Sequence, residues 1–172
     1  SESRARDFAG THRIATATAS VADLLALPGL EAVYISSTNE KHRAQAMAAL
    51  VAGKHVLCEK PLAMTLADAV AMTSLAEASG RVLATNHHLR CSGSHRAIRN
   101  LIAEGRIGRV LSLRLFHAVH LPQSLQGWRI TDAAAGGGVI ADITVHDADV
   151  ARFLLGEDPV AVVALSATAG MG

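Results

Sequence analysis

A carboxylate and an imidazole stand four residues apart in the second half of the chain, at Asp142 and His146. In an α-helix, residues at this spacing lie on one face, one turn apart. A carboxylate next to a histidine fixes the tautomer of the ring and stabilises its protonated form, as acid–base catalysis requires. A solvated pair on a helix surface has the same spacing, so the pattern alone leaves both interpretations open.

A lysine that could act with this pair occurs in the run Glu59-Lys60-Pro61, directly after an apolar segment. In open α/β sheets, ligands bind beyond the carboxyl ends of the strands, so Lys60 lies where a substrate is expected. An ammonium group there can donate a proton or a hydrogen bond to a carbonyl oxygen. Because a lysine at a strand end is more often solvated, the neighbouring motifs must decide its role.

A metal site is a competing interpretation of the same region, because Asp147 and Asp149 follow closely on Asp142 and His146. The two later aspartates fall on other faces of the expected helix, and no matching ligand cluster recurs elsewhere. The sequence therefore predicts no metal site.

Three short apolar segments, separated by helical patterns, must position these residues. Continuous apolar runs are typical of strands covered on both faces of a parallel sheet. Caps support the helices between them, with Ser20 and Thr65 at starts and Gly53 and Gly80 at ends. The expected strands are 32–35, 55–58 and 82–85, and the expected helices are 20–27, 41–52 and 65–80. This alternation predicts the α/β class, as a partial Rossmann-type, doubly wound parallel sheet.

The pattern changes after residue 85, which we take as the boundary between a partial dinucleotide-binding domain (1–85) and a partial α+β substrate domain (86–172). Alternating polarity over 110–119 predicts a half-exposed strand of a mixed or antiparallel sheet. The remaining expected elements are a helix at 95–103, a loop at 120–135, a helix at 140–155 and a strand at 159–167.

Composition excludes several classes of protein. Half of the 172 residues are hydrophobic, 18% are charged and the net charge is +1, which is typical of a folded globular protein. A net charge so close to zero predicts no nucleic-acid partner. The apolar stretches are too often interrupted by polar residues to span a membrane. Two cysteines, Cys58 and Cys91, are expected to be reduced thiols in a cytoplasmic protein.

Several motifs in combination resemble the Gfo/Idh/MocA family, which includes glucose–fructose oxidoreductase, inositol dehydrogenase and rhizopine-catabolism proteins. The resemblance covers essentially the whole chain. The motifs are Gly53-Lys54-His55-Val56, Cys58-Glu59-Lys60-Pro61-Leu62-Ala63, Gly136-Gly137-Gly138 and the spaced Asp142, His146 and Asp149. Segments that point to a keto-sugar reductase within the family are 35–40, 85–90, 116–119 and 125–129.

The resemblance implies NADPH-dependent reduction of a keto-sugar carbonyl of the 1,5-anhydro-D-fructose type. It implies the catalytic residues Lys60, Asp142 and His146, and it leaves open whether Lys60 or His146 delivers the proton. The residues implied to bind the cofactor are Arg4, Ser37, Thr38, Asn39, Glu40, Lys41, His42, Glu59, Lys60, Asn86, Trp128 and Arg129. Among these, Arg4 is expected at the end of a strand beside the ribose 2′-phosphate, and Lys60-Pro61 is a candidate cis peptide.

The chain departs from the family pattern because it has no Gly-x-Gly-x-x-Gly loop. We expect that the first βα unit, roughly thirty residues, precedes this sequence and supplies the main phosphate site. Two alternatives belong to other classes, since fold does not fix function. One is a non-catalytic regulator that senses a dinucleotide, and the other is a metal-dependent sugar isomerase or hydrolase. The sequence does not predict an oligomeric state.

Overall fold

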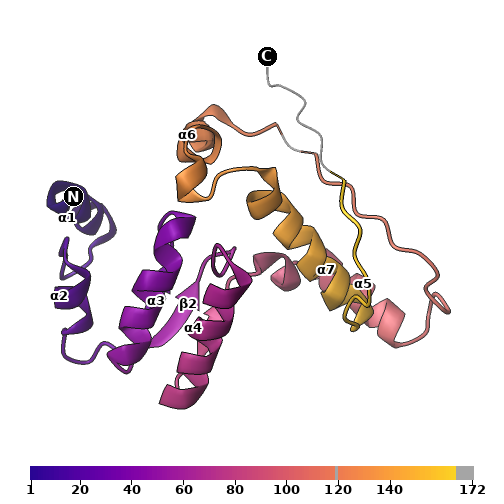
Figure 1. Ribbon diagram of the computed structural model, residues 1–172, viewed down its shortest axis with the longest axis horizontal. Coiled ribbons are helices and arrows are strands. Elements are labelled where there is room, and N and C mark those ends of the chain that lie inside the picture. Colours follow the sequence, from indigo (N-terminus) through magenta and orange to yellow (C-terminus); the bar gives the residue numbers. More distant parts are fainter. Residues whose placement is uncertain (119, 166–172) are drawn as a thin grey trace. The chain divides into compact units, whose positions relative to one another are not determined.

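The computed structural model describes residues 1–118 and 120–165 (Figure 1). Contacts divide them into two units. The first comprises residues 1–87 and 120–145, and the second comprises residues 88–118 and 146–165. The boundary expected after residue 85 stays a prediction, but the segment 120–145 packs with the first unit rather than with the rest of the second half.

The first unit is built on a three-stranded parallel sheet in the order β1-β2-β3. The strands are β1 (Ala32–Ile35), β2 (His55–Cys58) and β3 (Leu83–Thr85). In the register, Ile35 pairs with Cys58, and Cys58 pairs with Thr85, so all three strands end level with one another. The predicted strands and the predicted α/β class are confirmed, with β3 one residue shorter at its start than expected.

Two helices connect these strands and cover one face of the sheet, α3 (His42–Val51) after the short 3₁₀ turn η1 (Asn39–Lys41), and α4 (Leu66–Ser79). In Figure 1 they lie beside β2. Right-handed crossovers that advance in one direction place both helices on the same face. The core between helices and sheet contains Ile35, Ala46, Ala49, Leu50, Val56, Cys58, Met72 and Ala76.

Local capping fixes the ends of these helices as the sequence predicts. The hydroxyl of Thr65 accepts a hydrogen bond from the main-chain N–H of Asp68, and Ser20 does the same for Asp23. Gly80 ends α4 in the left-handed conformation, at φ 63°. Gly53, just beyond α3, has a φ of 72°.

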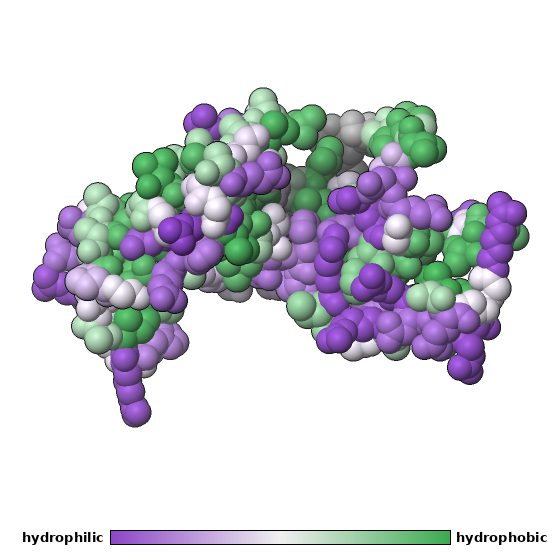
Figure 2. Space-filling view, turned by 90° about the horizontal axis from the view of Figure 1, so that it is seen from below, coloured by the Kyte–Doolittle hydropathy of each residue, from purple (hydrophilic) through white to green (hydrophobic). Residues whose placement is uncertain are grey.

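The other face of the sheet differs from the expectation of cover on both sides. Tyr34, Leu57 and Val82 are 55%, 40% and 60% exposed there. They border a groove of about 400 Å³. Figure 2 shows apolar side chains, in green, at the surface among polar ones in purple. Among the described residues, both crossover helices lie on one side, and this leaves the second face open.

Two further helices precede the sheet, α1 (Glu2–His12) and α2 (Val21–Leu25). Arg4 is exposed in the first turn of α1, with Ser1 at the N-cap. The placement of Arg4 at the end of a strand, beside the ribose 2′-phosphate, stays a prediction, since the only residues before it are Ser1, Glu2 and Ser3.

The last part of the first unit contains a helix where the sequence predicts a loop. Helix α6 (Gln123–Thr131) bends at Gly127, whose φ and ψ are 16° and −130°. A short 3₁₀ turn, η3 (Ala133–Ala135), and a π-helical turn, η4 (Ile140–Thr144), follow it. The glycine and the polar residues of the segment suggested a loop, but the glycine interrupts the helix without ending it.

The second unit contains η2 (His88–Cys91), α5 (Gly93–Ala103) and most of α7 (Val145–Leu155). The strands predicted at 110–119 and 159–167 are absent from 110–118 and 159–165, and residues 119, 166 and 167 lie outside the described residues. A strand needs a hydrogen-bonded neighbour, and within the described residues neither segment has one. Leu111 and Phe116 are accordingly 84% and 95% exposed. In the described ranges no helix is long and apolar enough to cross a membrane.

Candidate functional site

Polar residues gather where the three parallel strands of the first unit end. Ser37 follows β1, Glu59 and Lys60 follow β2, and Asn86 follows β3. The ladder continues into these loops, since the main-chain N–H of Glu59 donates to the carbonyl of Ile35 at 2.9 Å and that of Asn86 to Cys58 at 2.7 Å. This edge is where open α/β sheets bind their ligands. The structure thus brings together the residues that the sequence places after separate strands.

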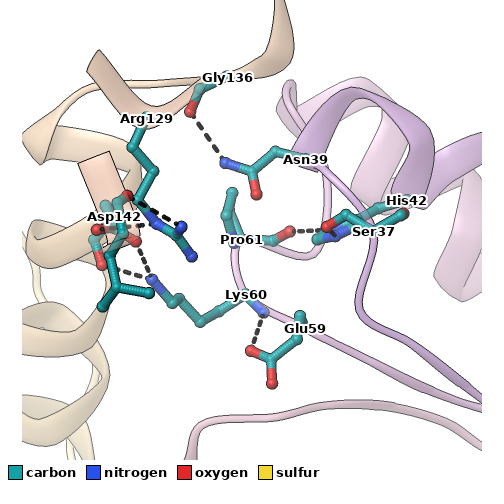
Figure 3. A network of polar contacts seen from close by, with 10 residues as sticks. Ser37, Asn39, His42, Glu59, Lys60, Pro61, Arg129, Gly136 and Asp142 are labelled. Atoms are coloured by element: carbon teal, nitrogen blue, oxygen red, sulfur yellow. Dashed lines mark hydrogen bonds and ion pairs between the residues drawn. The ribbon is translucent and has the colours of Figure 1, made fainter. Parts of the chain in front are cut away.

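Lys60 is held by Asp142, which is 82 residues away in the chain. Its Nζ donates to the carboxylate Oδ1 at 2.6 Å and to the main-chain carbonyl of the same residue at 2.7 Å (Figure 3). The two side chains are only 13% and 25% exposed, so little water competes for the pair. The Lys60-Pro61 peptide is cis, as predicted.

Arg129 is a second cation at the same carboxylate, with Nε 3.7 Å from Oδ2 of Asp142. Its guanidinium carbon lies 4.7 Å from the ring centroid of Trp128, within the range of a cation–π contact. Asp142 therefore lies between two positive groups, Lys60 and Arg129.

The predicted pairing of Asp142 with His146 stays a prediction. The sequence argument assumed an α-helix, but residues 140–144 form a π-helical turn, so the α-helical spacing does not hold over the whole segment. His146 belongs to the second unit, where the residue is 7% exposed and its ring meets the ring of His88 edge-on at 5.1 Å between centroids.

Glu59 is the centre of a cluster that the sequence did not reveal. The hydroxyl of Tyr34 donates to its Oε1, and the amide of Asn86 donates to the same oxygen at 2.7 Å. Burial alone would raise the pKa of Glu59, but these hydrogen bonds and the nearby Lys60 hold the pKa below its usual range. The same hydrogen bond raises the pKa of Tyr34. The carboxylate is therefore fixed and charged at neutral pH.

No signal in the sequence identified Tyr34, because it sits in an apolar strand and is typical of core packing. The pleat of the sheet places the side chain of Tyr34 on the same face as Glu59. Positions 34 and 57 are paired on neighbouring strands, and residue 59 follows two positions later on the same face.

The loop after β1 makes mostly internal contacts. Asn39 is 7% exposed, and its amide donates to the carbonyl of Gly136 at 2.9 Å. Thr38 donates to the carboxylate of Glu40 at 2.7 Å, which lowers the pKa of that exposed carboxyl. His42 is completely buried. We therefore correct the prediction that the side chain of His42 lines the cofactor, since its ring faces the protein interior.

The glycine-rich segment at 136–138 lets two parts of the chain approach closely. A Cβ at Gly136, where φ is 85°, would lie 2.6 Å from Sδ of Met64 and 2.8 Å from Cβ of Asn39. A Cβ at Gly137 would lie 2.6 Å from the carbonyl oxygen of Arg129. Glycine is required there so that the backbone can pack against the loop after β1 and against α6.

This arrangement can bind a polar ligand and stabilise negative charge on a carbonyl oxygen. Lys60 and Arg129 offer N–H donors, Glu59 offers a fixed acceptor, and all stand at the carboxyl edge of a parallel sheet. In the parts of the chain that are described, no group of three or more His, Cys, Asp and Glu residues is placed to hold a metal ion.

Two family models match the chain. Residues 1–87 match the model described as "Oxidoreductase family, NAD-binding Rossmann fold", and residues 95–172 match the model of the GFO/IDH/MocA C-terminal domain.

Individual sugar oxidoreductases are also similar to this chain. The chain is 57% identical over 172 residues to 1,5-anhydro-D-fructose reductase of Ensifer adhaerens. The aligned region covers 100% of this chain and 52% of that protein. It is 36% identical over 133 residues to levoglucosan dehydrogenase of Pseudarthrobacter phenanthrenivorans, covering 76% of this chain and 34% of that protein. The chain thus spans about half the length, or less, of these curated relatives.

Solved structures resemble the fold over most of the chain. A levoglucosan dehydrogenase in complex with NADH and levoglucosan has a TM-score of 0.78 and 32% identity, covering 91% of this chain and 43% of the other. The aldose-aldose oxidoreductase of Caulobacter crescentus, complexed with glycerol, has a TM-score of 0.81 and 30% identity, with coverages of 93% and 49%.

Proposed function

We propose, because this chain belongs to the Gfo/Idh/MocA oxidoreductase family, that it forms part of an NADP(H)-dependent enzyme that reduces a keto-sugar carbonyl. The substrate is a cyclic keto sugar of the 1,5-anhydro-D-fructose type. One observation carries the proposal: an ammonium group, Lys60, is held by a carboxylate, Asp142, at the carboxyl end of a parallel strand. The 57% identity to a reductase of that sugar supports the choice of substrate.

The cofactor would be held by the loop residues 37–41, by Glu59 and Asn86, and by Trp128 and Arg129. A bound reduced nicotinamide supplies a hydride to the carbonyl carbon. Fixed acceptors suit a ribose or a carboxamide, and Glu59 is such an acceptor because three N–H or O–H groups hold it in place. The preference for NADP(H) rests on Arg4 alone, as a partner for a 2′-phosphate.

Lys60 acts by stabilising the transition state. Two of the three N–H donors of its ammonium face Asp142, and the third can point at the oxygen of a substrate carbonyl. Negative charge would develop on that oxygen during the reduction, and the fixed ammonium of Lys60 would stabilise the charged transition state more than the neutral ground state. The proton that completes the alcohol comes from Lys60 or from His146.

Asp142 sets the position of this cation. An unpaired lysine side chain would sample many rotamers, whereas two hydrogen bonds to one residue confine Nζ to one place. Arg129, on the other side of the carboxylate, adds a second positive charge near the same oxygen site. A cytoplasmic location is also part of this proposal, in keeping with the two free cysteines Cys58 and Cys91.

The proposal is tested with the intact protein that carries this chain, by following NADPH consumption with 1,5-anhydro-D-fructose and a panel of other keto sugars. We expect turnover with a cyclic keto sugar and no loss of rate after treatment with a chelator. Cofactor binding without turnover of any sugar would instead favour the regulator, and activity abolished by the chelator would favour the metal enzyme.

A further inference from the structure

The side chain of His42 is buried completely at the start of α3, in a position where most buried residues of this helix are alanine or leucine. Its ring nitrogens both face main-chain carbonyl oxygens. Nδ1 is 2.8 Å from the carbonyl of Pro61, and Nε2 is 3.2 Å from that of Ser37 (Figure 3). A polar ring retained in the interior is generally there for its hydrogen bonds rather than for its volume.

The two carbonyls belong to the two loops that carry the candidate site. Pro61 follows Lys60 directly, and Ser37 lies two residues before Asn39, which reaches to Gly136. The imidazole of His42 therefore stands between the loop after β1 and the loop after β2.

The two distances favour Nδ1 of His42 as the nitrogen that donates. A carbonyl oxygen only accepts hydrogen bonds, and a neutral imidazole has a single N–H. The contact at Nδ1 has the usual length of an N–H···O bond, about 2.9 Å, and the contact at Nε2 is at the long end of the range. We therefore assign the hydrogen to Nδ1, with Pro61 as the acceptor.

Building on the proposed oxidoreductase activity, we propose that His42 is a positioning residue, which fixes Lys60 by donating a hydrogen bond from Nδ1 to the carbonyl of Pro61. Asp142 holds the far end of the lysine, at Nζ. His42 holds the backbone at its near end, one residue further on. The ammonium is then fixed from both ends, while His42 itself touches neither substrate nor cofactor.

Two substitutions separate this role from simple packing. In His42→Asn the side-chain amide nitrogen lies about where Nδ1 lies, so the bond to Pro61 can form. In His42→Gln the amide nitrogen lies about where Nε2 lies, so the bond is lost although more of the ring's volume is kept. If His42 only filled space, the smaller asparagine would be the worse replacement. If it positions Lys60, asparagine is the better one.

We expect kcat of His42→Asn within about threefold of the unsubstituted protein and kcat of His42→Gln at least about tenfold lower, since a small misplacement of a catalytic group is costly. The dissociation constant for NADPH, from quenching of Trp128 fluorescence, should change less than kcat in both. His95→Gln is the control, because it removes a 2.9 Å contact of Nδ1 with the carbonyl of Leu89 in the second unit. It should leave kcat unchanged.

The tautomer of His42 is a readout that does not depend on activity. Long-range ¹H–¹⁵N spectra of histidine-labelled protein should show its hydrogen on Nδ1. A hydrogen on Nε2, or a His42→Gln variant as active as His42→Asn, would overturn the positioning role. Lack of turnover by the unsubstituted protein would instead refute the proposed oxidoreductase, and the tautomer would still decide whether the bond to Pro61 exists.

Discussion

Lys60 and Asp142 form a two-point contact, in which one ammonium group bonds both the carboxylate and the main-chain carbonyl of the same residue at 2.6 and 2.7 Å. A single ion pair fixes a distance, but two bonds to one residue also fix a direction. The contact joins the end of β2 to the π-helical turn at residues 140–144. Such turns are frequent at functional sites, and here one presents its carbonyl to a side chain outside the helix.

The first prediction concerns this contact. Lys60→Ala should lower kcat by about 10²–10⁴, the usual contribution of a general acid, with a smaller effect on NADPH binding. His146→Ala should lower kcat by a factor in the same range if His146 delivers the proton. Asp142→Asn keeps the shape but loses the charge, and should cost less than Lys60→Ala.

Steady-state NADPH oxidation and fluorescence titration measure the two quantities. The Lys60→Ala and Asp142→Asn effects should be less than additive when combined, because the residues act as a unit. Lys54→Ala is the matched control, a lysine in the turn after α3, and should behave as the unsubstituted protein. Near-normal kcat in both Lys60→Ala and His146→Ala would contradict the catalytic assignment.

The second prediction concerns the cofactor. Arg4 is exposed in the first turn of α1, and its guanidinium is the proposed partner of the ribose 2′-phosphate. A charge-assisted hydrogen bond contributes about 1.5–3 kcal/mol, so Arg4→Ala should narrow the preference for NADPH over NADH by roughly ten- to a hundredfold. The ratio of kcat/KM for the two cofactors is the measurement. Arg6→Ala, two positions along the same helix, should leave that ratio unchanged, and equal use of both cofactors by the unsubstituted protein would contradict the prediction.

The third prediction follows from the lowered pKa of Glu59. The folded-state pKa lies below the unfolded value, so this carboxylate stabilises the fold above the unfolded pKa and loses that contribution as the pH falls through the folded pKa. Tyr34→Phe keeps the ring and removes the hydroxyl donor. The folded-state pKa should then rise, so the loss of stability on acidification should still begin near the unfolded pKa but be complete at a higher pH and be smaller in total.

Carbon-13 NMR titration of the glutamate carboxyls follows this change directly. Thr38→Val provides the comparison, because it removes the hydroxyl bonded to Glu40 and should move only the signal of that residue. An unchanged Glu59 signal in Tyr34→Phe would show that the hydrogen bond between the two residues does not hold down this pKa.

The fourth prediction concerns thiol reactivity. Burial, together with the neighbouring Glu59, raises the pKa of Cys58 to about 12, so its thiolate is scarce at neutral pH, and the side chain is 0% exposed. Cys91 is exposed. Of these two thiols, iodoacetamide should therefore modify one in the native protein and both after denaturation. Peptide mapping should place the native label on Cys91, and Cys91→Ser should abolish it; native labelling of Cys58 would show that β2 opens readily.

The fifth prediction concerns the glycine-rich segment. In Gly137→Ala the new Cβ would lie 2.6 Å from the carbonyl oxygen of Arg129, and main chain cannot move aside easily. We expect a loss of about 1–3 kcal/mol in the free energy of unfolding, as for an overpacked site. Gly10→Ala is the control: no atom lies within 4 Å of its added Cβ, and it lies inside α1. That change should stabilise by about 0.5–1 kcal/mol, and a neutral Gly137→Ala would mean that α6 and the glycines are not packed closely.

The sequence alone predicted the elements whose signals are local. The strands at 32–35 and 55–58 and the helix caps at Ser20 and Thr65 were predicted at their observed positions. A capping hydroxyl bonds an N–H three residues away, and a buried strand is a continuous apolar run. Such features need no knowledge of distant residues. Motif resemblance likewise identified Lys60 and Asp142 as members of one site without showing how they meet.

Only the tertiary structure decided which side chains are partners. The sequence offered His146, four residues away, as a partner of Asp142, and that pairing stays a prediction. The structure pairs Asp142 with Lys60, 82 residues away. It also turned His42 inward and brought Tyr34 to Glu59. The same limit explains the segment 110–118, whose alternating polarity predicts a strand that does not form in the described residues. A strand and an ion pair both require a second segment, and neither periodicity nor spacing along one segment says where that second segment lies.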